Sequence, residues 1–172
     1  MRICLTGGIA CGKSLFARHL KDFGVDFIDA DDVVHELIPA EERRRLAPIL
    51  FADPAARKAH EAKIHPVVRA RIAEALATRP WPVVAVVPLV FEAGMAADFD
   101  YVVCLRSSPE RQIARLMETR GLSAEAARAR LAAQMPIDEK AARSDCVVEN
   151  DGTPEALREK ARILAARIAA MG

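Results

Sequence analysis

The sequence predicts an α/β fold in which a five-stranded parallel sheet has helices on both faces. Short apolar runs alternate with long helical stretches, and all but one of these runs are nearly continuous in Val, Ile, Leu and Cys. Continuous apolar strands separated by helices indicate a parallel sheet that is buried on both faces. The composition agrees, because 52% hydrophobic and 28% charged residues in a chain of 172 are typical of one globular domain.

The elements follow from these runs in chain order. The predicted strands are residues 2–5, 25–28, 82–87, 101–105 and 146–148, and the predicted helices are 13–23, 54–77, 109–120, 124–133 and 154–170. The last helix has the clearest start, because Thr153 can cap it and Pro154 suits its first position. About forty residues separate the fourth and fifth strands, which is more than one crossover helix needs. We therefore expect a mobile helical lid at about residues 106–145.

Charge and cysteine usage narrow the classes of function. Lys and Arg number 25 against 24 Asp and Glu, so net charge gives no reason to expect a nucleic-acid or membrane partner. The cysteines (Cys4, Cys11, Cys104 and Cys146) lack a C-x-x-C pair and suit buried positions in a reducing compartment. The opening MRICLTGG is too short to span a bilayer, and no signal-peptide pattern follows. We expect a cytoplasmic protein, and its oligomeric state stays open.

The stretch TGGIACGKS at residues 6–14 fits the pattern G-x-x-x-x-G-K-[ST]. It lies directly after an apolar strand and before a helix, which is the setting that this phosphate-binding motif requires. Glycines let backbone N–H groups turn toward a compact anion, and the helix N-terminus adds partial positive charge. The motif predicts a P-loop NTPase-type three-layer fold. The alternative is a Gly-rich turn that only joins strand to helix.

The loop predicts a binding site for ATP and Mg²⁺. Lys13 would reach the β- and γ-phosphates, and the hydroxyl of Ser14 would hold the metal. The residues expected to bind the nucleotide are Gly8, Ile9, Ala10, Cys11, Gly12, Lys13, Ser14 and Leu15. The chain has neither the N-K-x-D nor the D-x-x-G motif of GTPase switches. Its size, the lid and the carboxylates described next favour a kinase that acts on a small molecule.

Three aspartates follow the second predicted strand, in the sequence FIDADD at residues 27–32. Ligands of open α/β sheets gather beyond the carboxyl ends of the strands, so these carboxylates should face the phosphate loop. A carboxylate there can accept a proton from an attacking hydroxyl or orient Mg²⁺. The alternative is that Asp31 or Asp32 only caps the next helix.

Six motifs in a fixed order carry a family resemblance. They are TGGIACGKS, IDADDVVHEL, FADPAARKAHEAKIHP, VVPLVFE, LAAQMP and VVENDGT. The chain resembles the dephospho-coenzyme A kinases over nearly its whole length. These enzymes use ATP to phosphorylate the 3′-hydroxyl of dephospho-coenzyme A in the last step of coenzyme A synthesis. The resemblance implies that this small molecule is the substrate.

The resemblance also implies roles for single residues. Asp31 would be the general base on the ribose hydroxyl, and Asp29 would support it or the metal. Further contacts to the acceptor are implied for Arg43, His65, Pro88 and Leu89. The plain alternatives are a solvated charge for Arg43, a helix-boundary residue for His65, and core positions for the apolar run after the third strand.

The lid and the last strand supply three more candidates. Arg111 and Arg115 fall on one face of a helix, and we expect Arg115 to neutralise charge on the transferred phosphoryl group. Lys140 is expected to bind substrate. The alternative for both residues is a charge on an exposed helix that contacts neither the phosphoryl group nor the substrate. Asn150 would approach the adenine, or would only form an Asn-Asp-Gly turn.

Three departures from the family pattern bear on function. The segment after IDADDVVHEL is shorter than expected, with Pro39 at a usual glycine position, so the acceptor-binding region at about residues 31–80 is predicted to be trimmed. Thr119 replaces a usual arginine, and the arginine is the next residue, Arg120. Ala10 and Cys11 replace Gly-Ser, and a cysteine at a helix N-terminus predicts a lowered pKa. Two other functions stay open: a kinase for another nucleoside-like or small hydroxyl acceptor, and a non-catalytic nucleotide-binding protein.

Overall fold

The computed structural model describes residues 1–172, with the side chain of Phe51 outside the description. Five strands form one sheet in the order β2-β3-β1-β4-β5, and every neighbouring pair is parallel. They are β1 (Ile3–Gly7), β2 (Asp26–Asp29), β3 (Val83–Val86), β4 (Tyr101–Arg106) and β5 (Cys146–Glu149). All five predicted strands are confirmed, and so is the parallel sheet.

Eight α-helices and one 3₁₀ turn surround the sheet. They are α1 (Lys13–Asp22), α2 (Ala30–Leu37), α3 (Ala40–Ala52), α4 (Pro54–Thr78), η1 (Ala96–Asp98), α5 (Pro109–Arg120), α6 (Ala124–Ala132), α7 (Ile137–Ala142) and α8 (Pro154–Ala169). The five predicted helices are confirmed, whereas α2, α3 and α7 were not predicted as separate helices, although residues 31–80 and the lid were expected to be helical. The Thr153 side chain accepts from the backbone N–H of Ala156 and so caps α8 as predicted.

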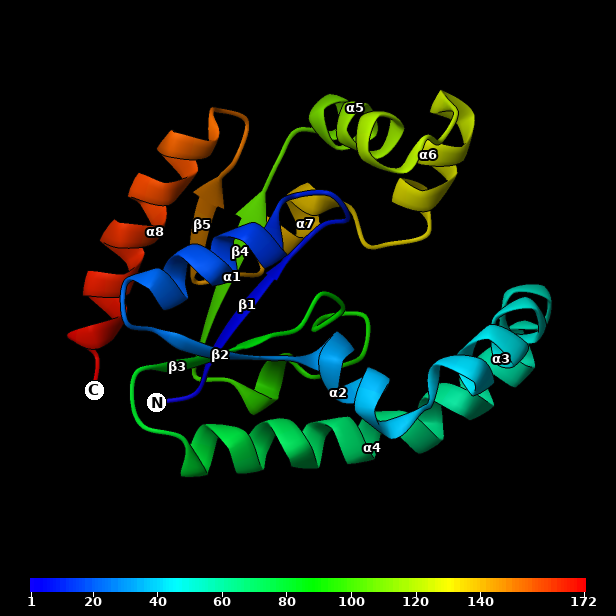
Figure 1. The fold of residues 1–172 in the computed structure, drawn as a ribbon, viewed down its shortest axis with the longest axis horizontal. Helices are drawn as coiled ribbons and strands as arrows, with labels where there is room; N and C mark the ends of the chain where they lie inside the picture. Colours follow the sequence, from blue (N-terminus) through cyan, green and yellow to red (C-terminus); the bar gives the residue numbers. More distant parts are fainter.

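Helices cover both faces of the sheet, so the three-layer architecture is confirmed (Figure 1). Ile3 and Leu5 of β1 pack in one core with residues of α1 and α8, whereas Cys4 packs in a second core with residues of α2 and α4. Successive side chains of a strand point to opposite faces, which explains this alternation. The buried sheet holds the carboxyl ends of the strands in place, and the loop after β1 lies at that edge.

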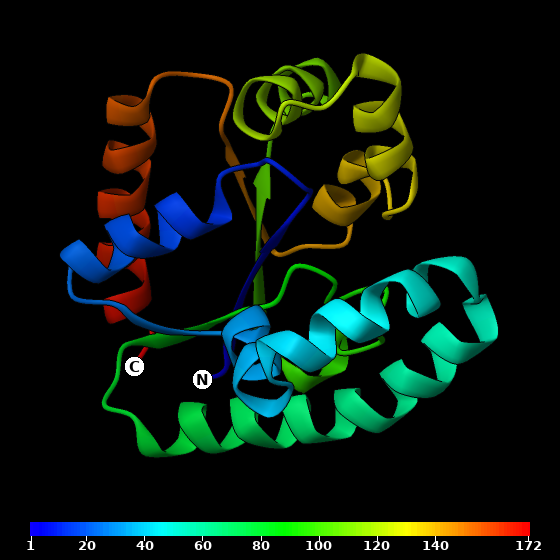
Figure 2. The same cartoon turned by 45° about the vertical axis from the view of Figure 1, so that its right-hand side comes forward.

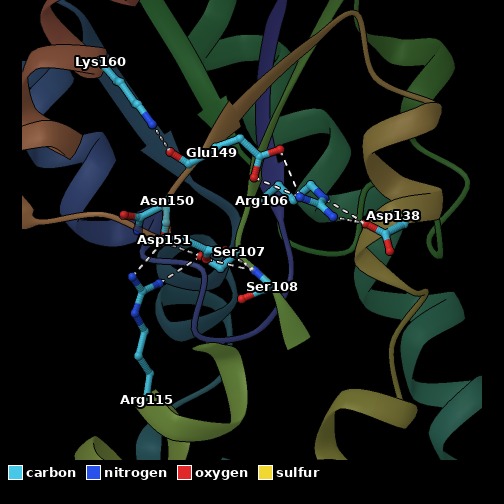
Figure 3. Close-up of polar contacts among 9 residues, drawn as sticks. All are labelled: Arg106, Ser107, Ser108, Arg115, Asp138, Glu149, Asn150, Asp151 and Lys160. Carbon is cyan, nitrogen blue, oxygen red and sulfur yellow. Dashed lines mark hydrogen bonds and ion pairs between the residues drawn. The ribbon is translucent and has the colours of Figure 1, made fainter. Parts of the chain in front are cut away.

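Helices α5, α6 and α7 form the connection between β4 and β5 that was predicted to be a lid (Figures 1 and 2). The short helix α7 is fixed to the sheet by Arg106 at the end of β4. Its Nε donates to Asp138 Oδ1 of α7 at 2.8 Å, and its Nη1 donates to Glu149 Oε2 of β5 at 3.0 Å (Figure 3). The base of this connection is therefore anchored to two strands.

A pair of helices at residues 40–66 projects from the rest of the molecule, and we call it the arm. It consists of α3 and the first half of α4, and it lies on the same side of the molecule as α6 in both views (Figures 1 and 2). Among its described side chains none is buried, and the buried residues of α4 (Val68, Ile72 and Ala75) all come later. No helix in the described chain is both long and apolar enough to cross a membrane.

Candidate active site

The loop between β1 and α1 passes very close to its neighbours, and this explains two of its glycines. A Cβ on Gly8 would collide with the side-chain amide of Gln112. A Cβ on Gly12 would lie 2.7 Å from Asn150 Nδ2, and Gly12 also has φ 88°, a conformation that favours glycine. The glycines of the motif therefore permit close approach of side chains as well as an unusual backbone.

The inside of this loop presents unpaired backbone donors. Between β1 and the end of the first turn of α1, six N–H groups have no hydrogen-bond partner among the described residues: those of Gly8, Ala10, Gly12, Lys13, Ser14 and Leu15. The last three belong to the first turn of α1, where N–H groups lack intrahelical acceptors. Because the helix N-terminus also carries partial positive charge, this cradle suits a compact anion such as a phosphate group.

Lys13 lies at the start of α1 with its ammonium folded back onto the loop. Its Nζ donates to the carbonyl oxygens of Gly7 at 2.9 Å and Gly8 at 2.7 Å. Burial lowers the pKa of Lys13; the nearby Lys140 also lowers it, and the Asp31 carboxylate opposes the lowering. The charge of Asp31 thus acts on Lys13, although no hydrogen bond or ion pair joins the two side chains among the described residues.

Asp29, and not Asp31 or Asp32, caps the helix that follows β2. Its Oδ1 accepts from the backbone N–H of Asp31 at 2.9 Å, and burial raises the pKa of Asp29. The alternative that Asp31 or Asp32 serves as the cap is therefore wrong. The Asp31 side chain is exposed in the first turn of α2 and has no hydrogen-bond or ion-pair partner among the described residues, so its carboxylate is free for a ligand.

Arg115 and Asn150 both reach the loop, and they bind it through its carbonyl groups. Arg115 Nη1 donates to the carbonyl of Ala10 at 3.2 Å. It also donates to Ser107 Oγ at 2.9 Å, and Arg115 Nη2 donates to the carbonyl of Asn150 at 2.7 Å (Figure 3). Asn150 Nδ2 donates to the carbonyl of Cys11 at 2.8 Å. In this structure the two side chains organise the loop, and their predicted contacts with the nucleotide stay predictions.

Lys140 is fully buried, whereas a cation on an exposed helix of the lid was expected. Its Nζ lies 2.8 Å from Glu92 Oε1 and donates to the carbonyl of Pro88 at 2.8 Å. The same Glu92 oxygen accepts from the backbone N–H of Met135 at 3.1 Å. This ion pair joins α7 to the segment after β3, while the predicted contact of Lys140 with substrate stays a prediction.

The other predicted acceptor residues are spread along α3, α4 and the segment after β3. His65 lies in the interior of α4, so the alternative that it is a helix-boundary residue is wrong. Arg43 lies on α3, and its buried Nε has no hydrogen-bond partner. Leu89 is 43% exposed, next to the half-buried Pro88, after β3. No hydrogen bond links Arg43 or His65 to the loop in the described chain.

Sequence reasoning missed Gln112, and it did not single out Gln134 of the LAAQMP motif. Both side chains bind Ile9 at the tip of the loop: Gln112 Nε2 donates to its carbonyl at 2.7 Å, and Gln134 Oε1 accepts from its N–H at 3.0 Å. One signal was available for Gln112. It stands four residues before the apolar Leu116 on α5, so it had to share the buried face of that helix.

The structure shows the surroundings of two residues that depart from the family pattern, Cys11 and Thr119. Cys11 has no exposed surface, and burial raises its pKa although Lys13 opposes this. The predicted low pKa is therefore wrong, because loss of hydration outweighs the helix N-terminus. Thr119 Oγ1 donates to the carbonyl of Arg115 at 2.6 Å, and the neighbouring Arg120 is exposed.

Comparison with known proteins decides the family. The family model described as dephospho-CoA kinase matches residues 1–42 and 40–155 of the chain. The dephospho-CoA kinase of Anaeromyxobacter dehalogenans is 42% identical over 190 residues, covering 95% of this chain and 90% of its own. That of Thermosynechococcus vestitus is 38% identical over 181 residues, covering 91% and 89%. The chain belongs to the dephospho-CoA kinase family.

A solved structure shares the fold of the whole chain. Protein TT1252 from Thermus thermophilus is 33% identical and superposes with a TM-score of 0.80, covering 100% of this chain and 98% of that one. The match to the family model divides at residues 40–42, at the start of α3. The shortened acceptor segment stays a prediction.

Proposed function

We propose that the protein transfers the γ-phosphoryl group of ATP to the ribose 3′-hydroxyl of dephospho-coenzyme A, giving coenzyme A and ADP. One observation carries the proposal in a chain of this family. A cradle of unpaired N–H groups, with the ammonium of Lys13 beside it, follows β1, and the free carboxylate of Asp31 follows β2 at the same edge of the parallel sheet. The cradle suits the phosphates of the donor, and the carboxylate suits the hydroxyl of the acceptor.

The donor nucleotide is proposed to bind residues 8–15. The N–H groups of Ala10, Gly12, Lys13, Ser14 and Leu15 would donate hydrogen bonds to the phosphate oxygens. Lys13 would then exchange the carbonyls of Gly7 and Gly8 for the β- and γ-phosphates. Its depressed pKa is expected to return toward the ordinary value in the complex, because the phosphates supply the missing counter-charge.

Mg²⁺ is proposed to arrive with the nucleotide and to bind the hydroxyl of Ser14. Such an ion takes most of its ligands from phosphates and water, so one hydroxyl is a usual contribution from the protein. Ser14 fits this role, because it is exposed in the first turn of α1 and its Oγ has no partner among the described residues. When bound, the ion would neutralise charge on the phosphates.

Asp31 is proposed to accept the proton of the attacking 3′-hydroxyl. Asp29 caps α2, which fixes the first turn and leaves the Asp31 carboxylate exposed at the end of β2. Phosphoryl transfer depends mainly on positioning and charge, so Asp31 would chiefly orient the hydroxyl in line with the γ-phosphate.

Residues 31–80 are proposed as the acceptor-binding region and residues 106–145 as the lid. The acceptor contacts would come from Arg43, His65, Pro88 and Leu89, with Lys140 acting from the lid. Arg115 and Asn150 are proposed to bind the nucleotide once it is present. We also propose a cytoplasmic location, because Cys4, Cys11, Cys104 and Cys146 are all free thiols, as suits a reducing compartment.

The test is to incubate purified protein with ATP–Mg²⁺ and dephospho-coenzyme A, beside a panel of nucleosides and small alcohols. ADP is measured, and ³¹P NMR identifies the position of the new phosphate. We expect ADP and a 3′-phosphorylated product with dephospho-coenzyme A only. The predicted shortening near residues 40–42 favours a second candidate, a kinase for a smaller acceptor, and turnover with another panel member would support it. ATP binding without ADP from any acceptor would instead indicate a non-catalytic protein.

A further inference from the structure

We propose that Gln112 is a positioning residue that keeps the nucleotide loop in its phosphate-binding shape. This inference rests on the proposed binding of ATP to residues 8–15, but it does not depend on the acceptor. Gln112 lies on α5, is only 3% exposed, and its Nε2 donates to the carbonyl of Ile9 at 2.7 Å. It acts on the nucleotide only through the loop.

The bond to Ile9 is part of a regular arrangement. Three consecutive carbonyl groups of the loop each accept from a side chain that belongs to a distant segment: Ile9 from Gln112 at 2.7 Å, Ala10 from Arg115 at 3.2 Å and Cys11 from Asn150 at 2.8 Å. Two of these donors come from α5 and one from the segment after β5. The carbonyl edge of the loop is therefore held from outside along its whole tip.

Peptide geometry connects this outer edge to the inner one. In a trans peptide the C=O of one residue and the N–H of the next point in opposite directions. When Gln112 holds the Ile9 carbonyl outward, the N–H of Ala10 turns inward. The bond from Asn150 to Cys11 does the same for the N–H of Gly12. Both inward N–H groups have no partner in the described chain, and so they remain available for phosphate.

Gly8 supports the same assignment. Its φ lies outside the left-handed region, so an alanine there would suit the backbone. The obstacle to a Cβ is the side-chain amide of Gln112, with Cys11 Sγ next at 3.3 Å. The absence of a side chain at Gly8 is what lets Gln112 reach Ile9. A loop of small residues without that bond would sample more conformations, and phosphate binding would have to order it.

The experiment measures ATP and ADP affinity by isothermal titration calorimetry without acceptor. Gln112→Glu keeps the shape of the side chain but replaces the donor by a carboxylate that repels the Ile9 carbonyl. We expect both affinities to fall about tenfold, the effect of one lost hydrogen bond of this kind. The matched control is Glu118→Gln, which changes an exposed residue of the same helix and should leave both affinities unchanged. Thermal unfolding checks that each variant is folded.

A double-mutant cycle separates positioning from general packing. Gly8→Ala should weaken ATP binding about as much as Gln112→Ala, because the new methyl group displaces the amide. In the Gln112→Ala background, Gly8→Ala should have little further effect, since its obstacle is gone. Additive losses, or affinities equal to wild type, would overturn the inference. Wild-type ATP binding without phosphorylation of dephospho-coenzyme A would refute the proposed function alone, whereas wild type that binds no ATP would refute both.

Discussion

The nucleotide loop and the arm, which lie on the two sides of the candidate site, are built in opposite ways. Every carbonyl from Gly7 to Cys11 accepts from a side chain, and the donors come from α1, α5 and the segment after β5. The arm, residues 40–66, has no buried side chain among those described. Side chains thus bind each carbonyl of the loop, whereas the two helices of the arm bury no described side chain.

This difference indicates where a change of length is most easily accommodated. The match to the family model divides at residues 40–42, where the arm begins. An exposed helix can lose residues without creating a cavity or an unpaired buried group. A change of length in the loop would break several carbonyl bonds at once. We infer that the phosphate site tolerates little variation and that the acceptor side can be remodelled.

The largest loss of activity is expected for a change at Lys13, at the end of the loop whose carbonyl groups are held by side chains. Lys13→Ala removes the cation from the phosphates and both bonds to the carbonyls of Gly7 and Gly8. We expect kcat/KM for ATP to fall at least about 10³-fold, as for loss of a main group that stabilises charge in the transition state. Thermal unfolding serves as the folding control. A folded variant that keeps a tenth of the wild-type turnover would contradict the role of Lys13.

A smaller but still large effect is expected at Asp31, where the loop and the acceptor side meet. Asp31→Asn removes the proton acceptor without changing the shape of the side chain, so turnover should fall about 10²- to 10³-fold. ATP affinity should stay within about twofold of wild type, because the cradle is intact. The matched control is Asp32→Asn, which alters the neighbouring exposed carboxylate. Equal losses in both variants would indicate a general charge effect and remove Asp31 as the base.

The helices and strands around the loop were predicted from the sequence better than those of the exposed arm, for a physical reason. Buried strands such as β1 and β4 must be apolar throughout, so their composition reveals them. Helix α3 has no buried side chain among those described, so no periodic apolar pattern marks it, and Pro48 inside it is unfavourable for a helix. The six-residue α7 is too short to show a period.

Side-chain partners were the other part that the sequence could not supply. A lysine in a helix looks the same in sequence whether it faces water or an acid, so burial of Lys140 against Glu92 was not predictable. The bond from Asn150 to Cys11 spans 139 residues, and that of Gln112 to Ile9 spans 103. Such contacts depend on how the sheet brings distant segments together.

The next prediction concerns the ion pair of Lys140 with Glu92, which joins α7 to the segment after β3. Lys140→Met leaves the carboxylate of Glu92 without its cation, and we expect the free energy of unfolding to fall by about 3 kcal/mol. This is the lower end of the range for a broken buried pair, because the Glu92 side chain remains 25% exposed. Urea unfolding measures the change. Adding Glu92→Gln should recover part of the loss, and a cost under about 0.5 kcal/mol for Lys140→Met would show that the pair contributes little.

The smallest effect is expected at Ala10, the one residue of the loop whose conformation does not suit its side chain. Ala10 has φ 59°, and the left-handed conformation costs an L-residue about 1–2 kcal/mol relative to its preferred one. Ala10→Gly removes that strain but makes the unfolded chain more flexible, which offsets about 0.4–1 kcal/mol. A net gain between about 0 and 1.6 kcal/mol in urea unfolding is therefore expected. ATP affinity should not change, because the Ala10 carbonyl keeps its bond to Arg115. Gly12→Ala should instead lower both the stability and the ATP affinity, since φ 88° and the nearby Asn150 exclude a Cβ. If Ala10→Gly instead weakened ATP binding severalfold, the strained residue would itself be holding the loop in shape.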